Sequence, residues 1–228
     1  MSVISLFSTP FVRTDLPNAD ALNGELHALF LQREGDGARW RNPDPTMTIG
    51  KGLFESKFDL FSWPVPCVQK LHEFCMRKLF ATIGELNDYA NEELYKLESQ
   101  THAWFHVTRR GGRFIAHNHP MASWSGVYCV SPGRHDTDAP DSGVLHFQNP
   151  HQQAAMFRDP ANLKMIDAYT MTGRNIHLKA GELVLFPSWM FHEVFPFQGE
   201  GERVTVAFNC WFRPLGSGSS DKPSPLLR

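Results

Sequence analysis

The sequence lacks the cysteine spacing and the charge excess that mark several large classes of protein. Its four cysteines are dispersed, with no Cys-x-x-Cys pair, and a chain of 228 residues does not depend on disulfide bonds for stability. We therefore expect reduced cysteines and a cytoplasmic location. Lysine and arginine number 22 against 24 aspartates and glutamates, so the net charge is −2, which disfavours nucleic acid as a partner.

Long apolar runs are absent as well. No stretch of about 18 apolar residues occurs, and no charged segment followed by an apolar run opens the chain. We therefore expect no membrane partner. No internal repeat is visible, and nothing in the sequence indicates an oligomeric state.

What the sequence does contain is aromatic residues and short β-like runs. Aromatic residues make up 12% of the chain, with 18 phenylalanines, which favours β-rich packing. A first strand is expected at residues 3–12. Helical spacing of apolar residues predicts helices over 22–30 and 68–83, and a weaker one over 87–98. The later strands are expected at residues 103–108, 124–130, 143–147, 176–178, 183–186 and 204–212.

Helices followed by many strands predict an α+β, mainly β fold. The architecture that fits is a double-stranded β-helix, or jelly roll, with the N-terminal helices buttressing one face. We expect one domain over residues 1–214 and a flexible tail over 215–228, which is rich in Gly, Ser and Pro. Residues 34–63 read as a long loop with a short strand near 52–56, either a lid or an irregular excursion.

Three histidines form the first candidate site. His117 and His119 are two residues apart on an extended segment, so their side chains point to the same face. His192 follows an apolar strand later in the chain. Three imidazoles that converge from two strands form an open half-shell, which suits a metal that keeps positions free for other ligands.

The strand after His192 carries a second candidate site. Residues 193–202 separate His192 from Arg203, and a two-residue period divides the strand into two faces. The apolar face holds Val204, Val206, Phe208 and Cys210. The other holds Arg203, Thr205, Ala207 and Asn209. A buried guanidinium needs a partner, which is either a bound carboxylate or an internal Asp or Glu.

Together these motifs resemble a known family. His117-x-His119-Pro, Ser125-Gly-Val-Tyr128, the run from Gly181 to His192 and the run from Arg203 to Asn209 are similar to a bacterial and phage family of 2OG-Fe(II) oxygenases. That family belongs to the iron(II)/2-oxoglutarate-dependent dioxygenase superfamily. The likeness also touches Leu6–Pro10 and Trp104, and its most specific part lies in residues 117–209.

The resemblance implies a jelly-roll core that binds Fe(II), 2-oxoglutarate and O2. His117, His119 and His192 would be both the metal ligands and the catalytic centre, and Arg203 with Thr205 would bind the distal carboxylate of 2-oxoglutarate. The reaction implied is hydroxylation of a C–H bond in a small molecule, amino acid or peptide, with release of succinate and CO2. One departure concerns His119, because the wider superfamily has Asp or Glu there. The exchange leaves the site one charge unit more positive and changes the metal preference.

Roles for five further residues stay open at this point. Tyr128 either donates a hydrogen bond to the keto acid or is a core tyrosine. Asn209 either reaches the metal-bound carboxylate or ties down a neighbouring strand. Trp104 and His106 share a face and either line the substrate pocket or only pack, and Trp124 borders either the pocket or the core.

Two alternative functions accompany the oxygenase hypothesis. One is a jelly-roll binding module without redox chemistry, with zinc or without a metal. The other is a cupin-like three-histidine oxygenase that binds substrate directly to iron and uses no keto acid. Arg203 discriminates between the two oxygenases, because only the keto-acid enzyme needs a carboxylate anchor.

Overall fold

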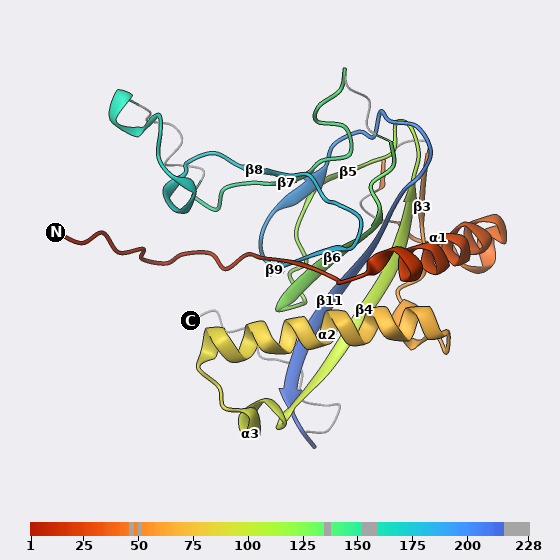
Figure 1. Ribbon diagram of the computed structural model, residues 1–228, viewed down its shortest axis with the longest axis horizontal. Helices are drawn as coiled ribbons and strands as arrows, with labels where there is room; N and C mark the ends of the chain where they lie inside the picture. The colour runs from red at the N-terminus through yellow and green to blue at the C-terminus, as the bar shows by residue number, and fades with distance from the viewer. Residues whose placement is uncertain (46–47, 50–51, 135–137, 152–158, 217–228) are drawn as a thin grey trace.

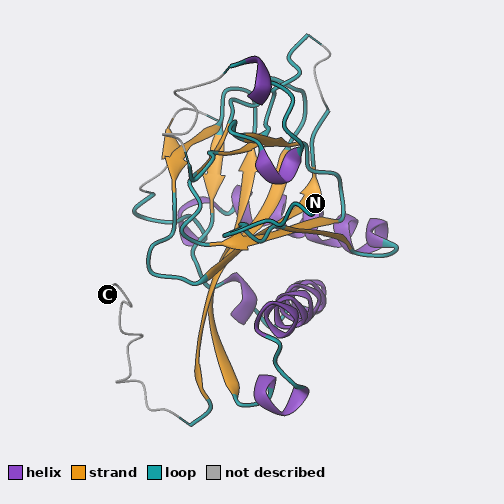
Figure 2. Ribbon diagram, turned by 90° about the vertical axis from the view of Figure 1, so that its left-hand side faces the viewer, coloured by secondary structure: helices purple, strands orange, loops and turns teal. Residues whose placement is uncertain are grey.

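Two antiparallel sheets make up most of the fold (Figures 1 and 2). The computed structural model describes residues 1–45, 48–49, 52–134, 138–151 and 159–216. Within them, the larger sheet has the order β1 (Val12–Asp15), β9 (Glu182–Pro187), β6 (Trp124–Ser131), β11 (Arg203–Pro214), β4 (Leu97–Thr108), β3 (Leu53–Glu55). The smaller has the order β2 (Thr48–Ile49), β5 (Arg113–His117), β10 (His192–Val194), β7 (Leu145–Phe147), β8 (Arg174–Ile176).

The strand pairs are nested along the chain. β4 pairs with β11, β5 with β10, β6 with β9 and β7 with β8, all antiparallel. The chain therefore runs out and back as one long ribbon that alternates between the two sheets. This is the winding of a jelly roll, so the predicted fold class is confirmed.

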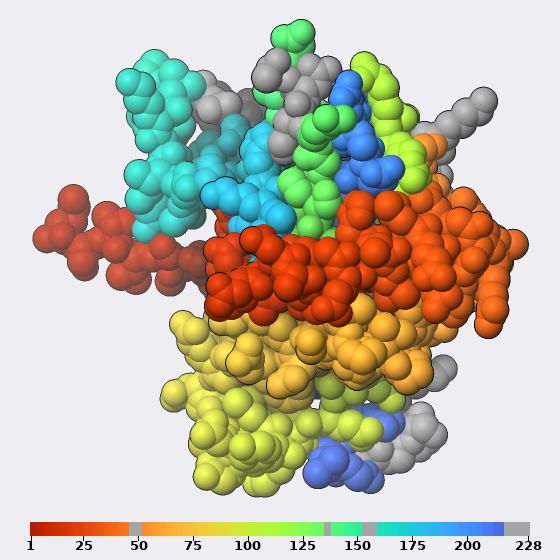
Figure 3. Space-filling model, turned by 45° about the vertical axis from the view of Figure 1, so that its right-hand side comes forward, coloured from red at the N-terminus to blue at the C-terminus, as the bar shows by residue number. Residues whose placement is uncertain are grey.

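Helices cover the outer face of the larger sheet. They are α1 (Ala19–Gly35), α2 (Pro66–Asn87) and the short α3 (Asn91–Leu94). Elsewhere along the chain, 3-10 turns occur at Gly37–Arg39, Leu60–Ser62, Pro160–Asn162 and Asp167–Tyr169. Figure 3 shows α1, in red to orange, lying beside α2, in orange to yellow. Proline occupies the first position of α2, where its missing N–H costs no helical hydrogen bond. The buried stripe of α2 includes Leu71, Cys75 and Leu79. None of the described helices is long and apolar enough to cross a membrane.

The main core lies between these helices and the larger sheet. Phe30 of α1 stacks on Phe105 of β4 with ring centroids 4.2 Å apart. The predicted apolar face of β11 joins the same core, through Val204, Val206, Phe208 and Cys210. The opposite face of β11 therefore points between the two sheets, as expected from the two-residue period. All four cysteines are free and buried.

Three sequence expectations are wrong or fall outside the described residues. Residues 3–11 form no strand, because only Val12–Asp15 find a partner, β9, and Val3, Ile4, Leu6 and Phe7 stay exposed. The third helix is a single turn, since Asp88 takes a left-handed conformation and ends α2. The short strand near 52–56 is confirmed as β3. The predicted flexible tail falls largely on residues 217–228, which the structure does not describe.

Candidate active site

The three candidate histidines meet in space. His117 ends β5 and His192 begins β10, and the antiparallel register places these two residues opposite each other. His119 follows in the turn after β5. One ring nitrogen from each histidine lies within 4.8 Å of the others, and ring centroids are 4.5 to 5.2 Å apart. No other Cys, His, Asp or Glu of the described residues joins this cluster.

Backbone carbonyls orient two of these rings. His117 Nδ1 lies 2.6 Å from the carbonyl oxygen of Ile115, and His192 Nδ1 lies 2.9 Å from that of Met190. Each Nδ1–H therefore donates to a carbonyl, which leaves the Nε2 lone pair free for a metal, as is common around ligating histidines. Burial lowers the pKa of His117, that of His119 to about 4 and that of His192 to about 3. At neutral pH the rings are thus in the unprotonated form that binds a metal.

Arg203 lies buried on the wall of the cavity that contains these histidines. Burial lowers the pKa of its guanidinium, and among the described residues no Asp or Glu forms an ion pair with it. The expectation that Arg203 pairs with an internal acid is therefore not met by any described residue. A Cβ at Gly143 would lie 3.0 Å from Arg203 Cδ, so this glycine allows close packing against the arginine. An unpaired buried cation of this kind calls for an anionic ligand.

Further polar groups line the same cavity. Thr205 and Asn209 share the Arg203 face of β11 and both face the cavity, as the two-residue period predicts. Thr108 is the cross-strand partner of Arg203, and its buried hydroxyl has no hydrogen-bond partner among the described residues. The cavity wall therefore presents the Arg203 guanidinium together with the polar side chains of Thr205 and Asn209, and Thr108 lies beside Arg203 on the neighbouring strand. These groups fit the carboxylate of a small acid.

Ser125 and Ser188 were missed by the sequence reasoning. Ser125 Oγ donates to Asn209 Oδ1 at 2.7 Å and lies 2.8 Å from Ser188 Oγ. Ser125 lies opposite Asn209 in the β6–β11 register, so the two side chains share a face. The network orients the Asn209 amide, and it also ties β6 to β11. Knowledge of the register would have been needed to find it.

Two candidate site residues on β6 lie away from the cavity. Of the two roles left open for Tyr128, the structure favours the core tyrosine over the keto-acid contact, because its hydroxyl donates to Asn23 Oδ1 at 2.7 Å and its ring packs in the main core. Of the two positions left open for Trp124, the structure favours the core over the substrate pocket, because it packs against the same core and does not line the cavity. Both residues sit on the face of β6 opposite to Ser125, because side chains alternate along a strand.

Trp104 and His106 do line the cavity. They lie opposite Ala207 and Thr205 in the β4–β11 register, which directs them to the cavity face. The Trp104 ring centroid is 6.1 Å from that of His119, and its indole nitrogen is 2.9 Å from His106 Nε2. Trp104 and His106 therefore form the part of the cavity wall where β4 of the larger sheet faces the three histidines. Their role toward substrate stays a prediction.

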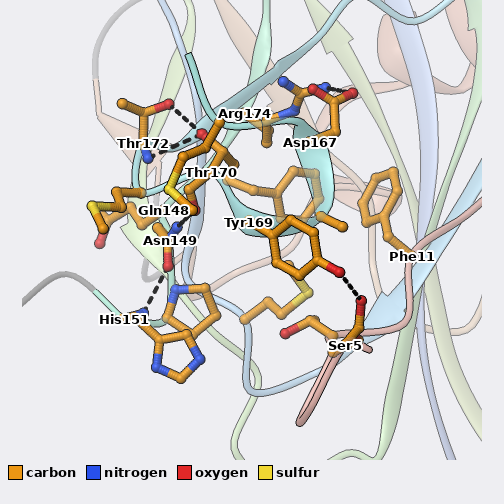
Figure 4. Close-up of a pocket in the computed structure, with 18 of the residues that line it drawn as sticks. Ser5, Phe11, Gln148, Asn149, His151, Asp167, Tyr169, Thr170, Thr172 and Arg174 are labelled. Carbon is orange, nitrogen blue, oxygen red and sulfur yellow. Dashed lines mark hydrogen bonds and ion pairs between the residues drawn. The ribbon is translucent and has the colours of Figure 1, made fainter. Parts of the chain in front are cut away.

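A second and larger cavity, of about 770 Å³, lies beside the N-terminal segment (Figure 4). No described residue lines both cavities. Its polar groups largely satisfy each other: Ser5 contacts Tyr169, Asn149 donates to the Thr170 carbonyl and Arg174 pairs with Asp167. Phe147 lines this cavity and also lies 5.6 Å from His192 between ring centroids, so the cavity abuts the back of the histidine cluster.

Comparison with known proteins agrees with this geometry. A family model described as "Putative 2OG-Fe(II) oxygenase" matches residues 102–209, the segment that holds the histidines and Arg203. The matched segment belongs to that family. The oxygenase segment accordingly has Fe(II) as its metal and 2-oxoglutarate as its co-substrate, and three imidazoles are a donor set that iron accepts. No curated protein matches the chain.

Solved structures share the fold of this oxygenase at low sequence identity. A Pseudomonas putida prolyl-4-hydroxylase is 20% identical with a TM-score of 0.54, over 91% of this chain and 94% of that one. A Trichoplax adhaerens prolyl hydroxylase, solved with a hypoxia-inducible-factor peptide, is 14% identical with a TM-score of 0.58, over 88% and 83%. HygX from Streptomyces hygroscopicus, solved with nickel, 2-oxoglutarate and hygromycin B, is 12% identical with a TM-score of 0.54, over 90% and 83%.

Proposed function

We propose that the protein is an Fe(II)- and 2-oxoglutarate-dependent oxygenase that hydroxylates a C–H bond of a small molecule or peptide. His117, His119 and His192 hold the metal, and Arg203 with Thr205 binds the distal carboxylate of 2-oxoglutarate. The observation that carries this proposal is the buried guanidinium, which pairs with no described Asp or Glu, on the wall of the cavity that also contains three neutral imidazoles. When bound, the iron supplies oxidative decarboxylation of the keto acid to succinate and CO2, coupled to substrate oxidation.

Charge supports a doubly negative co-substrate. The three imidazoles contribute no charge, and the Arg203 guanidinium adds one positive charge to the two of the metal. A dicarboxylate neutralises the guanidinium at one end and binds the metal at the other. In a buried site this pairing offsets the cost of desolvating the cation. A cupin-like enzyme that uses no keto acid has no use for this arginine.

The remaining cavity residues position groups and exclude water. Phe186, Leu145 and Val194 give the cavity apolar walls beside the histidines. Asn209, held by Ser125, presents an amide group to the same space. A dry site strengthens each electrostatic contact to the bound acid. For the oxidised substrate, we propose a small molecule, an amino acid or a peptide, because the structures with this fold include enzymes solved with a peptide and with hygromycin B.

Anaerobic spectroscopy followed by a turnover assay tests the proposal. Adding Fe(II) and then 2-oxoglutarate to the metal-free protein should give a weak visible charge-transfer band, and aerobic incubation should release succinate without further substrate. His192→Ala should abolish both signals. His146→Ala is the matched control, because His146 lies on the neighbouring strand β7, is hydrogen-bonded to Asn175 and is outside the cluster. A colourless mixture without succinate would favour a binding module instead.

A further inference from the structure

Glu55 is a largely buried acid beside the candidate active site, and the proposed reaction gives it no role. It ends β3, and the register places it opposite His106, which in turn lies opposite Thr205. Because cross-strand neighbours share a face, Glu55 points toward the inside of the jelly roll. Its side chain is 11% exposed. An acid at this depth needs a reason, because buried carboxylates are costly unless they are compensated.

The partners of Glu55 carry no full positive charge. Glu55 Oε2 lies 3.1 Å from His106 Nε2, and Oε1 accepts a hydrogen bond from Asn42 Nδ2 at 2.6 Å. No lysine or arginine of the described residues forms an ion pair with it. Burial raises the pKa of Glu55, but the hydrogen bonds from His106 and Asn42 outweigh burial and leave the pKa below its ordinary value. The carboxylate is therefore ionised at neutral pH.

The charge of Glu55 is felt at the histidine cluster. Glu55 contacts His106, which lines the same cavity as the three histidines. A physical link also runs through side chains, since His106 contacts Trp104 and the Trp104 ring faces His119. His106 Nε2 donates to Glu55 when it is protonated and accepts from the Trp104 indole when it is not. Because His106 is neutral in both tautomers, the Glu55–His106 pair carries one negative charge in either case.

The three-histidine cluster lacks the acid that the wider superfamily has at position 119. Three neutral ligands leave the charge of a divalent metal uncompensated within the coordination shell. We propose that Glu55 supplies this missing negative charge from outside the shell, held in place by His106 and Asn42, and so strengthens metal binding. Glu55 is a positioning and charge-compensating residue and not a ligand, because it lies outside the cluster of nitrogen donors. The inference rests on the proposed metal site.

Metal affinity without co-substrate tests this role. Metal-free protein is titrated with Co(II), and binding is followed by the visible absorption of the ion. Glu55→Gln keeps the size of the side chain and removes its charge, and it should weaken Co(II) binding by about tenfold or more, the usual effect of groups behind metal ligands. Glu55→Asp keeps the charge and should stay closer to the wild type than Glu55→Gln. Loading with iron gives a second readout, since Glu55→Gln should raise the Fe(III)/Fe(II) midpoint potential.

Glu182→Gln is the matched control. Glu182 is also a buried acid of the larger sheet, but it lies near the edge of the sheet opposite to β3 and pairs there with Arg13. It has no contact with the three histidines among the hydrogen bonds and ion pairs of the described residues. Its loss should leave Co(II) affinity and potential unchanged. Circular dichroism in EDTA checks that each variant is folded, and Glu55→Met replaces Glu55→Gln if the latter does not fold.

The outcomes separate the two levels of the argument. If the wild type binds no Co(II), the metal site itself is refuted. If the wild type binds Co(II) and the uncharged Glu55 variant binds it within twofold with an unchanged potential, the role of Glu55 is overturned. Equal weakening by Glu55→Asp and Glu55→Gln would also overturn it, since a charge effect distinguishes these two variants.

Discussion

Replacing Arg203 should make the ligand-free protein more stable while it removes 2-oxoglutarate binding. Arg203 is 4% exposed, and no described acid pairs with it. Methionine has a similar volume and needs no partner. Replacing a buried ion pair by apolar side chains of similar size often stabilises proteins by about 1–4 kcal/mol, and a buried charge without a partner costs at least as much to desolvate. At roughly 3 °C per kcal/mol for a chain of this size, Arg203→Met should melt about 3–12 °C higher in EDTA.

The same variant should lose the stabilisation that the co-substrate gives. At a hundredfold excess over its Kd, 2-oxoglutarate adds about 2.7 kcal/mol to the metal-loaded wild type. Loss of the guanidinium should cost about 2–5 kcal/mol of binding free energy, or roughly 30-fold or more in Kd. Calorimetry of both proteins, with and without 2-oxoglutarate, measures the two effects. Arg213→Met is the control, because Arg213 lies on the same strand but pairs with Glu98 outside the cavity.

A specific pattern of melting temperatures would refute this reasoning. If Arg203→Met melts below the wild type in EDTA, then Arg203 has a stabilising partner within the fold and is not an unpaired cation that awaits a ligand. An unchanged response to 2-oxoglutarate would show that the distal carboxylate binds elsewhere. Arg213→Met should lose stability and keep its response to the co-substrate.

Three further predictions concern groups around the site and in the core. Tyr128→Phe should lower the free energy of unfolding in urea by about 1–3 kcal/mol, because Asn23 Oδ1 loses its donor. The affinity for 2-oxoglutarate should stay unchanged, and a weakened affinity would mean that Tyr128 contacts the co-substrate after all. Ser125→Ala should destabilise by a similar amount, since Asn209 loses its donor, and unfolding in urea at an unchanged midpoint would contradict this. Burial lowers the pKa of His72, so the unfolded chain takes up a proton first as the pH falls through about 6.5, and the folded state loses stability there. His72→Phe keeps the stacking on Phe61, and its free energy of unfolding relative to that of the wild type should rise as the pH falls from 7 to 5. Equal slopes of unfolding free energy against pH in both proteins would refute the lowered pKa of His72 in the folded state.

Local periodicity made much of the fold and the site predictable. Alternation along β11 separates Arg203 and Thr205 from Val204 and Val206, and this division needs no knowledge of neighbouring strands. The two-residue spacing of His117 and His119 works in the same way. The helical stripe of α2 is likewise a local pattern, and the structure confirms it.

Pairing between distant segments explains what local patterns could not predict. Ser125 meets Asn209, and Glu55 meets His106, only through the strand register, which depends on the whole fold. Residues 3–11 have the composition of a strand but find no partner strand. Tyr128 is instructive, because it lies in a motif with Ser125 yet points to the opposite face. Membership of a motif does not decide which way a strand residue points.

Restoring an acid at position 119 tests whether His119 is a ligand. His119→Asp places a carboxylate where the wider superfamily has one, and carboxylates favour Mn(II) whereas imidazole favours Ni(II) and Cu(II). The ratio of Mn(II) to Ni(II) affinity should therefore rise in His119→Asp, as measured by competition titration of the metal-free protein. Some stability should be lost as well, because the shorter side chain leaves space beside the Trp104 ring.

Asn118→Asp separates ligation from simple charge. Asn118 is adjacent in sequence, is partly exposed and donates to the Trp189 carbonyl, so its variant adds the same charge close to the site without a ligand atom in the cluster. It should strengthen binding of all divalent ions slightly and leave the Mn(II) to Ni(II) ratio unchanged. An equal change of the ratio in both variants, or none in His119→Asp, would mean that His119 lies beside the metal without binding it. In that case the charge of Glu55 would act on a site with two histidine ligands, and a third ligand would have to come from solvent or substrate.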